Sequence, residues 1–213
     1  LLKEALDEPG AREFLDSRLT NAIQVGPALD GPLTDLVLQA DSERLSEVLI
    51  GGVLKKDLHL PNTQSLLWSY LDDYDFILTP LPNHLFQRDN TAFVYDGLSV
   101  NPMAKPARKR ETLHSRTIWN FHPRFKDAGL NFYYGNDDDQ HEPATVEGGD
   151  ILVIGNGAVM IGMGERTTPQ GVEVLARKWF QYGQGKITKV IVVELPKTRA
   201  FMHLDTAMTQ IDK

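Results

Sequence analysis

The chain has 213 residues, 41% of them hydrophobic and 24% charged, which is the composition of an ordinary globular protein long enough to bury a core. Its formal net charge of −7 argues against binding to nucleic-acid phosphates. No apolar run approaches the ~20 residues that cross a bilayer, and the first residues lack a signal-peptide pattern, so we expect a cytoplasmic protein without a membrane partner.

The chain contains no cysteine. This excludes a disulfide framework and a thiolate zinc site within these residues, and a mechanism that needs a cysteine nucleophile must obtain it from elsewhere. The sequence also opens inside a helical pattern at residues 1–6, with no capping residue before it. We therefore expect a segment of a longer protein.

Residues 1–72 are predicted to form a helical bundle subdomain. Apolar residues recur with helical spacing over 11–23, and a second helix is predicted to begin near Thr34 and Asp35 and to end at Gly51. The stretch has no cluster of ionisable residues. We expect it to supply packing elements rather than a site.

Residues 73–213 are predicted to form short strands and helices in a repeating order. The first unit, residues 89–135, is predicted to contain a strand at 90–95, a turn at Asp96 and Gly97, a returning strand at 98–100, a helix after Pro106 and a strand at 131–134. The second unit, residues 150–195, is predicted to contain strands at 151–154 and 158–161 joined by Asn156 and Gly157, a helix capped by Thr168, and a strand at 189–195.

The two units begin at Asp89 and Asp150, so the repeat is about 60 residues long. A third unit is predicted to begin at His203, with its first strand at 206–211. Because one copy cannot bury its own sheet face, we expect the copies to surround a common axis.

Each unit has a carboxylate where its first strand begins, namely Asp89, then Glu147 and Asp150, then Asp205. His203 and Asp205 are predicted to share one face of a strand, because side chains two residues apart do so. Carboxylates that converge on one pocket raise one another's pKa unless a cation lies among them. The pattern therefore predicts a cation site.

Two kinds of cation fit that prediction. A divalent metal would use His203, Asp205, Glu147 and Asp89. The set contains only one histidine and no paired ligand spacing, which argues against a metal. A planar guanidinium, with five donors in a rigid fork, suits two or three carboxylates better.

Five motifs carry a resemblance to a known family. They are Pro82-Asn83, Phe86-Gln87-Arg88-Asp89, Glu147-Gly148-Gly149-Asp150, Gly164-Glu165-Arg166-Thr167 and Met202-His203-Leu204-Asp205-Thr206. In order and spacing the chain resembles the arginine deiminases of the guanidine-modifying superfamily. Related amidinotransferases and dimethylarginine hydrolases have elements similar to the third motif, Glu147 to Asp150, and to the last. Gln87 stands where the family usually has threonine.

The resemblance implies an α/β (α+β) fold, a pseudo-fivefold propeller of strand-strand-helix-strand modules with an inserted helical bundle. This chain would hold about two modules and the start of a third, without the first module.

The resemblance also implies hydrolysis of L-arginine to L-citrulline and ammonia through a cysteine thiouronium intermediate, without a cofactor or a metal. It implies that Asp89 and Asp205 hold the substrate guanidinium, assisted by Glu147, and that His203 is the general acid and base. The residues that would border the substrate are Asn83, Phe86, Arg108 and Arg166. Arg108 is singled out by the resemblance alone, whereas Lys109 and Arg110 are interpreted as a solvated helix face.

Because the nucleophile is not in this chain, we expect the segment alone to be inactive. The alternatives are a non-catalytic guanidine-binding or interaction module, and another enzyme of the amidinotransferase or dimethylarginine hydrolase kind. The expected partner is a small-molecule substrate, with homo-oligomer formation possible because a partial propeller would expose apolar sheet faces.

Overall fold

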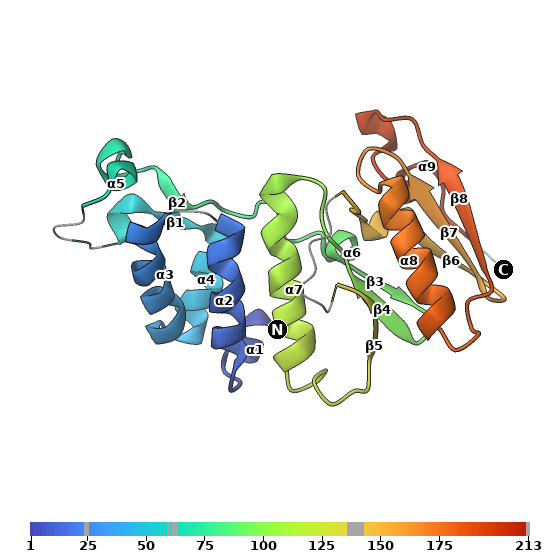
Figure 1. The fold of residues 1–213 in the computed structure, drawn as a ribbon, viewed down its shortest axis with the longest axis horizontal. Helices are drawn as coiled ribbons and strands as arrows, with labels where there is room; N and C mark the ends of the chain where they lie inside the picture. The colour runs from blue at the N-terminus through green and yellow to red at the C-terminus, as the bar shows by residue number, and fades with distance from the viewer. Residues whose placement is uncertain (24–25, 59, 61–63, 136–142, 212–213) are drawn as a thin grey trace. The chain divides into compact units, whose positions relative to one another are not determined.

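The computed structural model is a mixed α/β structure and describes residues 1–23, 26–58, 60, 64–135 and 143–211 (Figure 1). The chain forms two compact units. The first consists of Leu1–Leu85 with Thr117–Ala128, and the second of Phe86–Arg116 with Gly129–Lys213. Among the described residues, no helix combines the length and the apolar character that a bilayer span requires.

The first unit is mainly helical. Its elements are α1 (Leu2–Leu6), α2 (Ala11–Ile23), α3 (Pro27–Gln39), α4 (Ser42–Gly51), β1 (Val53–Leu54), the 3-10 helix η1 (Lys55–Asp57), α5 (Leu66–Tyr70) and β2 (Phe76–Leu78). Strands β1 and β2 pair antiparallel. The helices bury leucines such as Leu15, Leu29 and Leu45, so this unit has a core of its own.

The single helix predicted from Thr34 to Gly51 is wrong, because two helices occupy this stretch. The helix α3 starts at Pro27, which fits the first helical position, and it continues through Thr34. The chain then turns at Ala40, and the side chain of Asp41 accepts a hydrogen bond from the backbone N–H of Arg44 to cap α4.

The second unit begins with α6 (Gln87–Asn90), β3 (Thr91–Val94) and β4 (Gly97–Val100), followed by η2 (Pro106–Arg108), the start of α7 (Lys109–Phe121) and β5 (Asn131–Tyr134). From Thr117 onward, α7 belongs to the first unit. Strand β4 pairs antiparallel with β3 and parallel with β5. The hairpin is confirmed, but its two turn residues are Tyr95 and Asp96. Gly97 starts β4, where a Cβ atom would lie 2.7 Å from the carbonyl oxygen of Asn131 and would overlap the ring of Tyr133.

The same order follows with η3 (Gly148–Asp150), β6 (Ile151–Gly155), β7 (Ala158–Met163), α8 (Pro169–Tyr182) and β8 (Lys189–Glu194). Asn156 and Gly157 form the turn of this hairpin, and both have the positive φ that such a turn requires, 50° and 76°. The side chain of Thr168 caps α8 by accepting the N–H of Gly171, as the sequence predicts. The repeated strand-strand-helix-strand order is therefore present twice.

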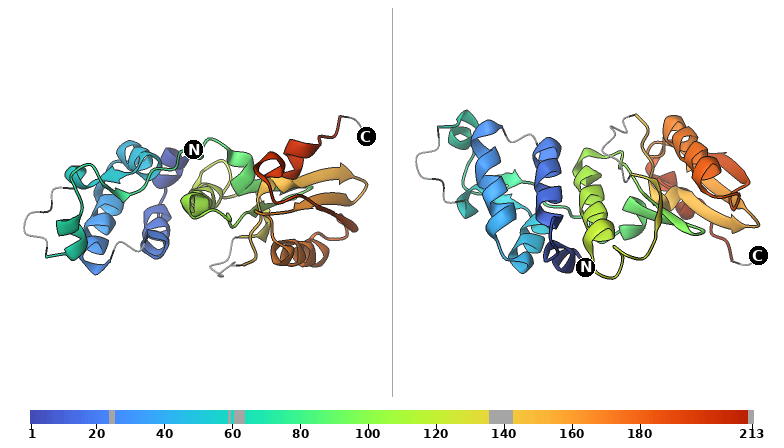
Figure 2. Two further views of the ribbon diagram at one scale, coloured as in Figure 1. Left: turned by 90° about the horizontal axis from the view of Figure 1, so that it is seen from above. Right: turned by 60° about the horizontal axis from the view of Figure 1, so that its bottom comes forward.

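One hydrophobic core joins both sheets of the second unit. Trp179 and Leu175 of α8 are fully buried and pack in one cluster with Val94 and Tyr133 of the first sheet and Val159 of the second. Figure 2 shows α8 on one face of the β6-β7-β8 sheet and the short helix α9 (Leu204–Ala207) on the other side. The turns that contain the sequence motifs are therefore connected to strands and helices with a packed core.

The strand predicted at 206–211 is wrong. The short 3-10 helix η4 (Arg199–Phe201) leads into α9, and the described residues 208–211 form no strand. A strand requires a neighbour that satisfies its backbone N–H and C=O groups. Among the described residues, no strand pairs with this segment.

Candidate functional site

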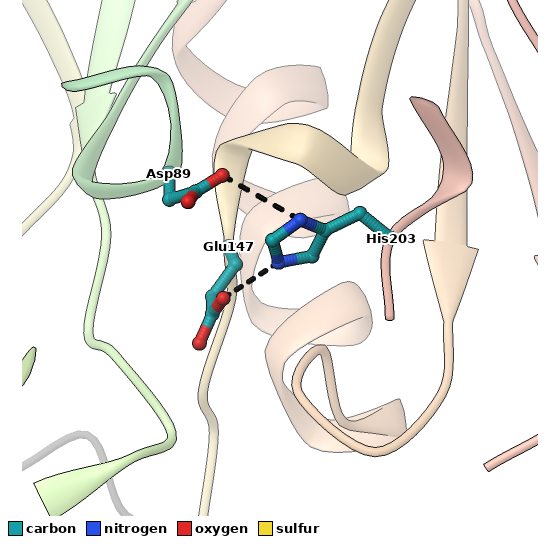
Figure 3. Close-up of side chains that lie close together, drawn as sticks. All are labelled: Asp89, Glu147 and His203. Atoms are coloured by element: carbon teal, nitrogen blue, oxygen red, sulfur yellow. Dashed lines mark hydrogen bonds and ion pairs between the residues drawn. The ribbon is translucent and has the colours of Figure 1, made fainter. Parts of the chain in front are cut away.

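Three turns of the second unit bring Asp89, Glu147 and His203 together (Figure 3). Asp89 lies in α6, Glu147 directly precedes η3, and His203 is the residue before α9. Two glycines allow the turns to approach one another closely, because they have no side chain. A Cβ atom at Gly148 would overlap the carbonyl oxygen of Arg88, and one at Gly149 would lie 2.7 Å from Nδ1 of His203. The Gly-Gly pair is therefore required by close approach, not only by turn formation.

The imidazole of His203 is placed between two carboxylates. Its Nε2 atom lies 2.6 Å from Oε2 of Glu147, and its Nδ1 atom lies 3.6 Å from Oδ1 of Asp89 (Figure 3). Burial of the ring alone would lower the pKa of His203, but the hydrogen bond to Glu147 and the charge of Asp89 outweigh it, so the pKa is raised. The site thus favours the protonated imidazole, which is the form that can donate a proton.

Glu147 is fully buried and keeps its charge through hydrogen bonds from two cationic partners, with Nη1 of Arg108 a further 3.9 Å from Oε2. Burial would raise its pKa, but hydrogen bonds from His203 and from Nη1 of Arg166, 3.0 Å from Oε2, lower it overall. Both of these partners contact Oε2. The second oxygen, Oε1, has no hydrogen-bond partner among the residues that the structure describes. A buried anionic acceptor is left available beside His203.

Arg108 is held by carboxylates in the interior of the second unit. Its Nε and Nη2 atoms donate to the two oxygens of Glu111, each at 2.9 Å, and Nη1 donates to Asp89 at 2.8 Å. Burial would lower the pKa of Arg108, but these carboxylates raise it. Most of its donors are therefore committed to Asp89 and Glu111, so Arg108 neutralises and orients Asp89.

Sequence reasoning did not identify Glu111 as part of the site. The available signal was its i, i+3 spacing from Arg108 at the start of a helix, which brings two side chains onto one face. Sequence reasoning also placed Arg110 on a solvated face, and this is wrong. Arg110 is only 6% exposed, and burial lowers its pKa to about 10. Lys109 is exposed, as predicted.

Asp205 does not share a strand face with His203, so that expectation is wrong. Asp205 lies in the first turn of α9, and its Oδ2 atom lies 3.3 Å from Nε of Arg88. The Asp205 side chain is 32% exposed, whereas that of His203 is 6% exposed. Among the described residues, the carboxylates that contact the imidazole are those of Asp89 and Glu147.

The remaining predicted residues differ in position. Phe86 precedes α6, has a half-exposed ring and accepts a hydrogen bond from Arg108 through its carbonyl oxygen. Arg166 contacts Glu147 with one donor, and its Nε has no partner among the described residues. Asn83 belongs to the first compact unit and not to the second, which contains the cluster.

A metal ion fits this cluster less well than an organic cation. Asp89, Glu147 and His203 offer ligand atoms within 4.8 Å of one another. However, arginine side chains already bind both carboxylates, and the raised pKa of His203 opposes the neutral imidazole that a metal needs. A guanidinium requires only acceptors, and Oε1 of Glu147 is one.

Solved structures similar to this chain include three dimethylarginine dimethylaminohydrolases. A histidine-to-glycine variant bound to S-methyl-L-thiocitrulline is 22% identical, with a TM-score of 0.42, over 57% of this chain and 43% of that one. A cysteine-to-serine variant of the Pseudomonas aeruginosa enzyme bound to citrulline is 23% identical, with a TM-score of 0.43, over 60% of this chain and 44% of that one. An adduct with 4-chloro-2-hydroxymethylpyridine is 23% identical, with a TM-score of 0.41, over 59% of this chain and 46% of that one.

This chain spans less than half the length of those relatives. Its sequence matches the arginine deiminase family over residues 1–213. The match covers both compact units and every motif described above. The chain therefore belongs to the arginine deiminase family.

Proposed function

We propose that this chain carries the guanidinium-binding and proton-transfer part of an enzyme that hydrolyses L-arginine to L-citrulline and ammonia. The observation that carries the proposal is Glu147 Oε1, a buried carboxylate oxygen without a described partner, beside a histidine that favours its protonated form. An isolated buried acceptor is costly, and a cationic substrate with planar N–H donors would satisfy it.

In this proposal, the substrate guanidinium donates to Oε1 of Glu147 and to the carboxylates of Asp89 and Asp205. Asp205 already contacts a guanidinium, that of Arg88, through Nε at 3.3 Å. The Arg88 side chain is 55% exposed, so its ion pair with Asp205 is weak. Its Nη2 atom donates to the carbonyl oxygen of Ile151 at 2.8 Å, and that hydrogen bond does not involve Asp205. Release of the ion pair would present Asp205 to the substrate.

The reaction begins when a cysteine thiolate, supplied from outside these 213 residues, attacks the guanidinium carbon. Protonated His203 donates its proton to the departing nitrogen, the C–N bond breaks, and ammonia leaves a thiouronium. Neutral His203 then takes a proton from water, whose oxygen attacks the same carbon. Cleavage of the C–S bond releases citrulline and restores the thiolate, while the second proton of the water passes to the released ammonia, which becomes ammonium.

Arg166 is the stronger candidate of the two arginines for binding the substrate carboxylate. It has a donor without a described partner, and its side chain is 18% exposed, against 5% for Arg108. We propose that Arg108 acts mainly by holding Asp89, and that Asn83 and Phe86 border the substrate. We also propose that the two strand-strand-helix-strand units are modules of a propeller.

The test is a citrulline assay on the complete natural gene product and on this chain alone. We expect the complete product to convert L-arginine to citrulline and ammonia, and the 213-residue chain to bind L-arginine without turnover, because it contains no cysteine. Turnover by the isolated chain would refute the cysteine mechanism. Arginine binding without turnover by the complete product would favour a non-catalytic guanidine-binding module.

A further inference from the structure

Asp150 and Thr167 form a buried bracket that the proposed reaction does not use. Asp150 is 1% exposed and Thr167 is fully buried. One oxygen of Asp150 accepts the backbone N–H of Leu204 at 2.8 Å. The other oxygen accepts the hydroxyl of Thr167, and the same hydroxyl accepts the backbone N–H of Glu147 at 3.1 Å.

The bracket joins the backbones of both members of the His203–Glu147 pair. Leu204 directly follows His203, so the Asp150 carboxylate anchors the turn that carries the imidazole. The hydroxyl of Thr167 anchors Glu147 at its own N–H group. A side chain that fixed only one of the two turns would leave the other free to move. These two residues connect both turns through a single chain of hydrogen bonds.

The surroundings leave little space for another arrangement. A Cβ atom at Gly162 of β7 would overlap Oδ1 of Asp150, and one at Gly149 would lie 2.7 Å from the ring of His203. The carboxylate and the imidazole are therefore each confined by a glycine. Burial raises the pKa of Asp150 to about 6, partly offset by the hydrogen bonds from Thr167 and Leu204. A leucine at this position would leave the N–H of Leu204 and the hydroxyl of Thr167 without this acceptor.

We propose that Asp150 and Thr167 are positioning residues for the reaction, which hold His203 against Glu147 without touching the substrate themselves. The claim that Asp150 and Thr167 matter for turnover rests on the proposed function. The claim that they hold His203 against Glu147 does not. The groups that surround His203 are the carboxylates of Glu147, Asp89 and Asp150. Thr167 carries no charge, so replacing it adds and removes no ionisable group. Its hydroxyl acts on His203 by anchoring Glu147 and by lowering the pKa of Asp150, whose charge helps to raise the pKa of His203.

The test is an NMR titration of the His203 ring in this chain. The signal of His203 is the one that disappears in the variant His203→Ala. The variants are Thr167→Val, which has nearly the same shape without the hydroxyl, and Thr167→Ser, which keeps it. Thr112→Val is the matched control, because it removes a hydroxyl that donates to the carbonyl of Asn101 in the same unit. Circular dichroism checks the fold, and Thr167→Ala replaces the valine variant if that one does not fold.

We expect Thr167→Val to bring the titration midpoint of His203 down toward the ordinary histidine value of about 6.5. Thr167→Ser and Thr112→Val should keep the raised wild-type midpoint. Calorimetry should show L-arginine affinity reduced on the order of tenfold in Thr167→Val, the effect of losing about one buried hydrogen bond. Equal midpoints in Thr167→Val and wild type, or an equal decrease in Thr112→Val, would overturn the proposal. Absence of arginine binding by the wild type would refute the proposed function instead, because the midpoints are measured without arginine.

Discussion

The Nε2 atom of His203 lies 2.6 Å from the Oε2 atom of Glu147, and both side chains are almost completely buried. The contact joins two turns that are 56 positions apart in the sequence. In a buried setting a charge-assisted hydrogen bond of this kind is strong, and it keeps both groups ionised. The contact keeps His203 in its protonated form.

The His203–Glu147 pair should stabilise the fold in a defined pH window. The raised pKa of His203 means that its contribution is complete below the ordinary histidine value of 6.5 and is lost as the pH rises through the folded pKa. The lowered pKa of Glu147 means that its contribution is complete above 4.5 and is lost as the pH falls. Urea unfolding of wild type and His203→Ala should therefore differ most between these values. A difference in stability that does not vary with pH would show that His203 and Glu147 do not form a charged pair.

Asp150 should make the fold less stable as the pH rises. Its folded pKa of about 6 lies above the ordinary value of 3.8, so its contribution is complete below 3.8 and is lost as the pH rises through 6. The shift corresponds to a loss on the order of 3 kcal/mol. Asp150→Asn, measured by urea unfolding from pH 4 to 8, should not show this decrease. Asp96→Asn is the control and should keep the decrease, because the hydrogen bond from Lys186 lowers the pKa of Asp96 and its own contribution changes only below pH 3.8.

Gly149→Ala should displace the imidazole of His203. The added methyl group would lie 2.7 Å from Nδ1 and 2.8 Å from Cγ of that ring, so the ring must leave its present position between Glu147 and Asp89. The NMR titration midpoint of His203 should decrease and arginine binding should weaken. Gly164→Ala is the matched control, because its methyl group would meet Leu195 at an ordinary 3.5 Å. An unchanged midpoint in Gly149→Ala would show that the close approach is not needed.

Trp179→Ala should destabilise the second unit strongly. Trp179 is fully buried in the cluster that α8 forms with both sheets, and truncating such a side chain costs about 3–5 kcal/mol. Its neighbour Phe180 is 53% exposed, so Phe180→Ala should cost less than about 1 kcal/mol. Urea unfolding of the two variants compares them directly. Equal losses of stability would show that α8 does not hold the two sheets together.

His203→Ala should nearly abolish turnover in the complete gene product. Removing a general acid and base reduces rates by about 10²–10⁴-fold. The substrate should still bind, because the carboxylates of Glu147 and Asp89 remain. Normal turnover in this variant, measured as citrulline formed per enzyme, would rule out His203 as the proton carrier.

Short sequence signals were sufficient to predict the start of α8 and the β6-β7 turn in the second unit. Thr168 and Pro169 determine the start of α8, and Asn156 with Gly157 determines the turn of the β6-β7 hairpin, because each acts within a few residues. The turn at Tyr95 and Asp96 could not be predicted in this way. Gly97 is needed there to leave room for Tyr133, which is distant in the sequence.

The site shows the same division between local and distant causes. The repeated motifs identified Asp89, Glu147 and His203, and the structure brings the three together. The partners of these residues depend on tertiary packing. Asp205 pairs with Arg88, and Glu111 is buried against Arg108, and neither contact follows from the repeat.

Calorimetric titration of L-arginine into the chain tests most directly whether this cluster recognises a guanidinium. We predict saturable binding at a single site, which Glu147→Gln weakens because the neutral amide cannot hold the cation as well. L-norleucine, which has an α-carboxylate but no guanidinium, should not bind. Absence of arginine binding at millimolar concentration, or equal binding by wild type and Glu147→Gln, would contradict the account.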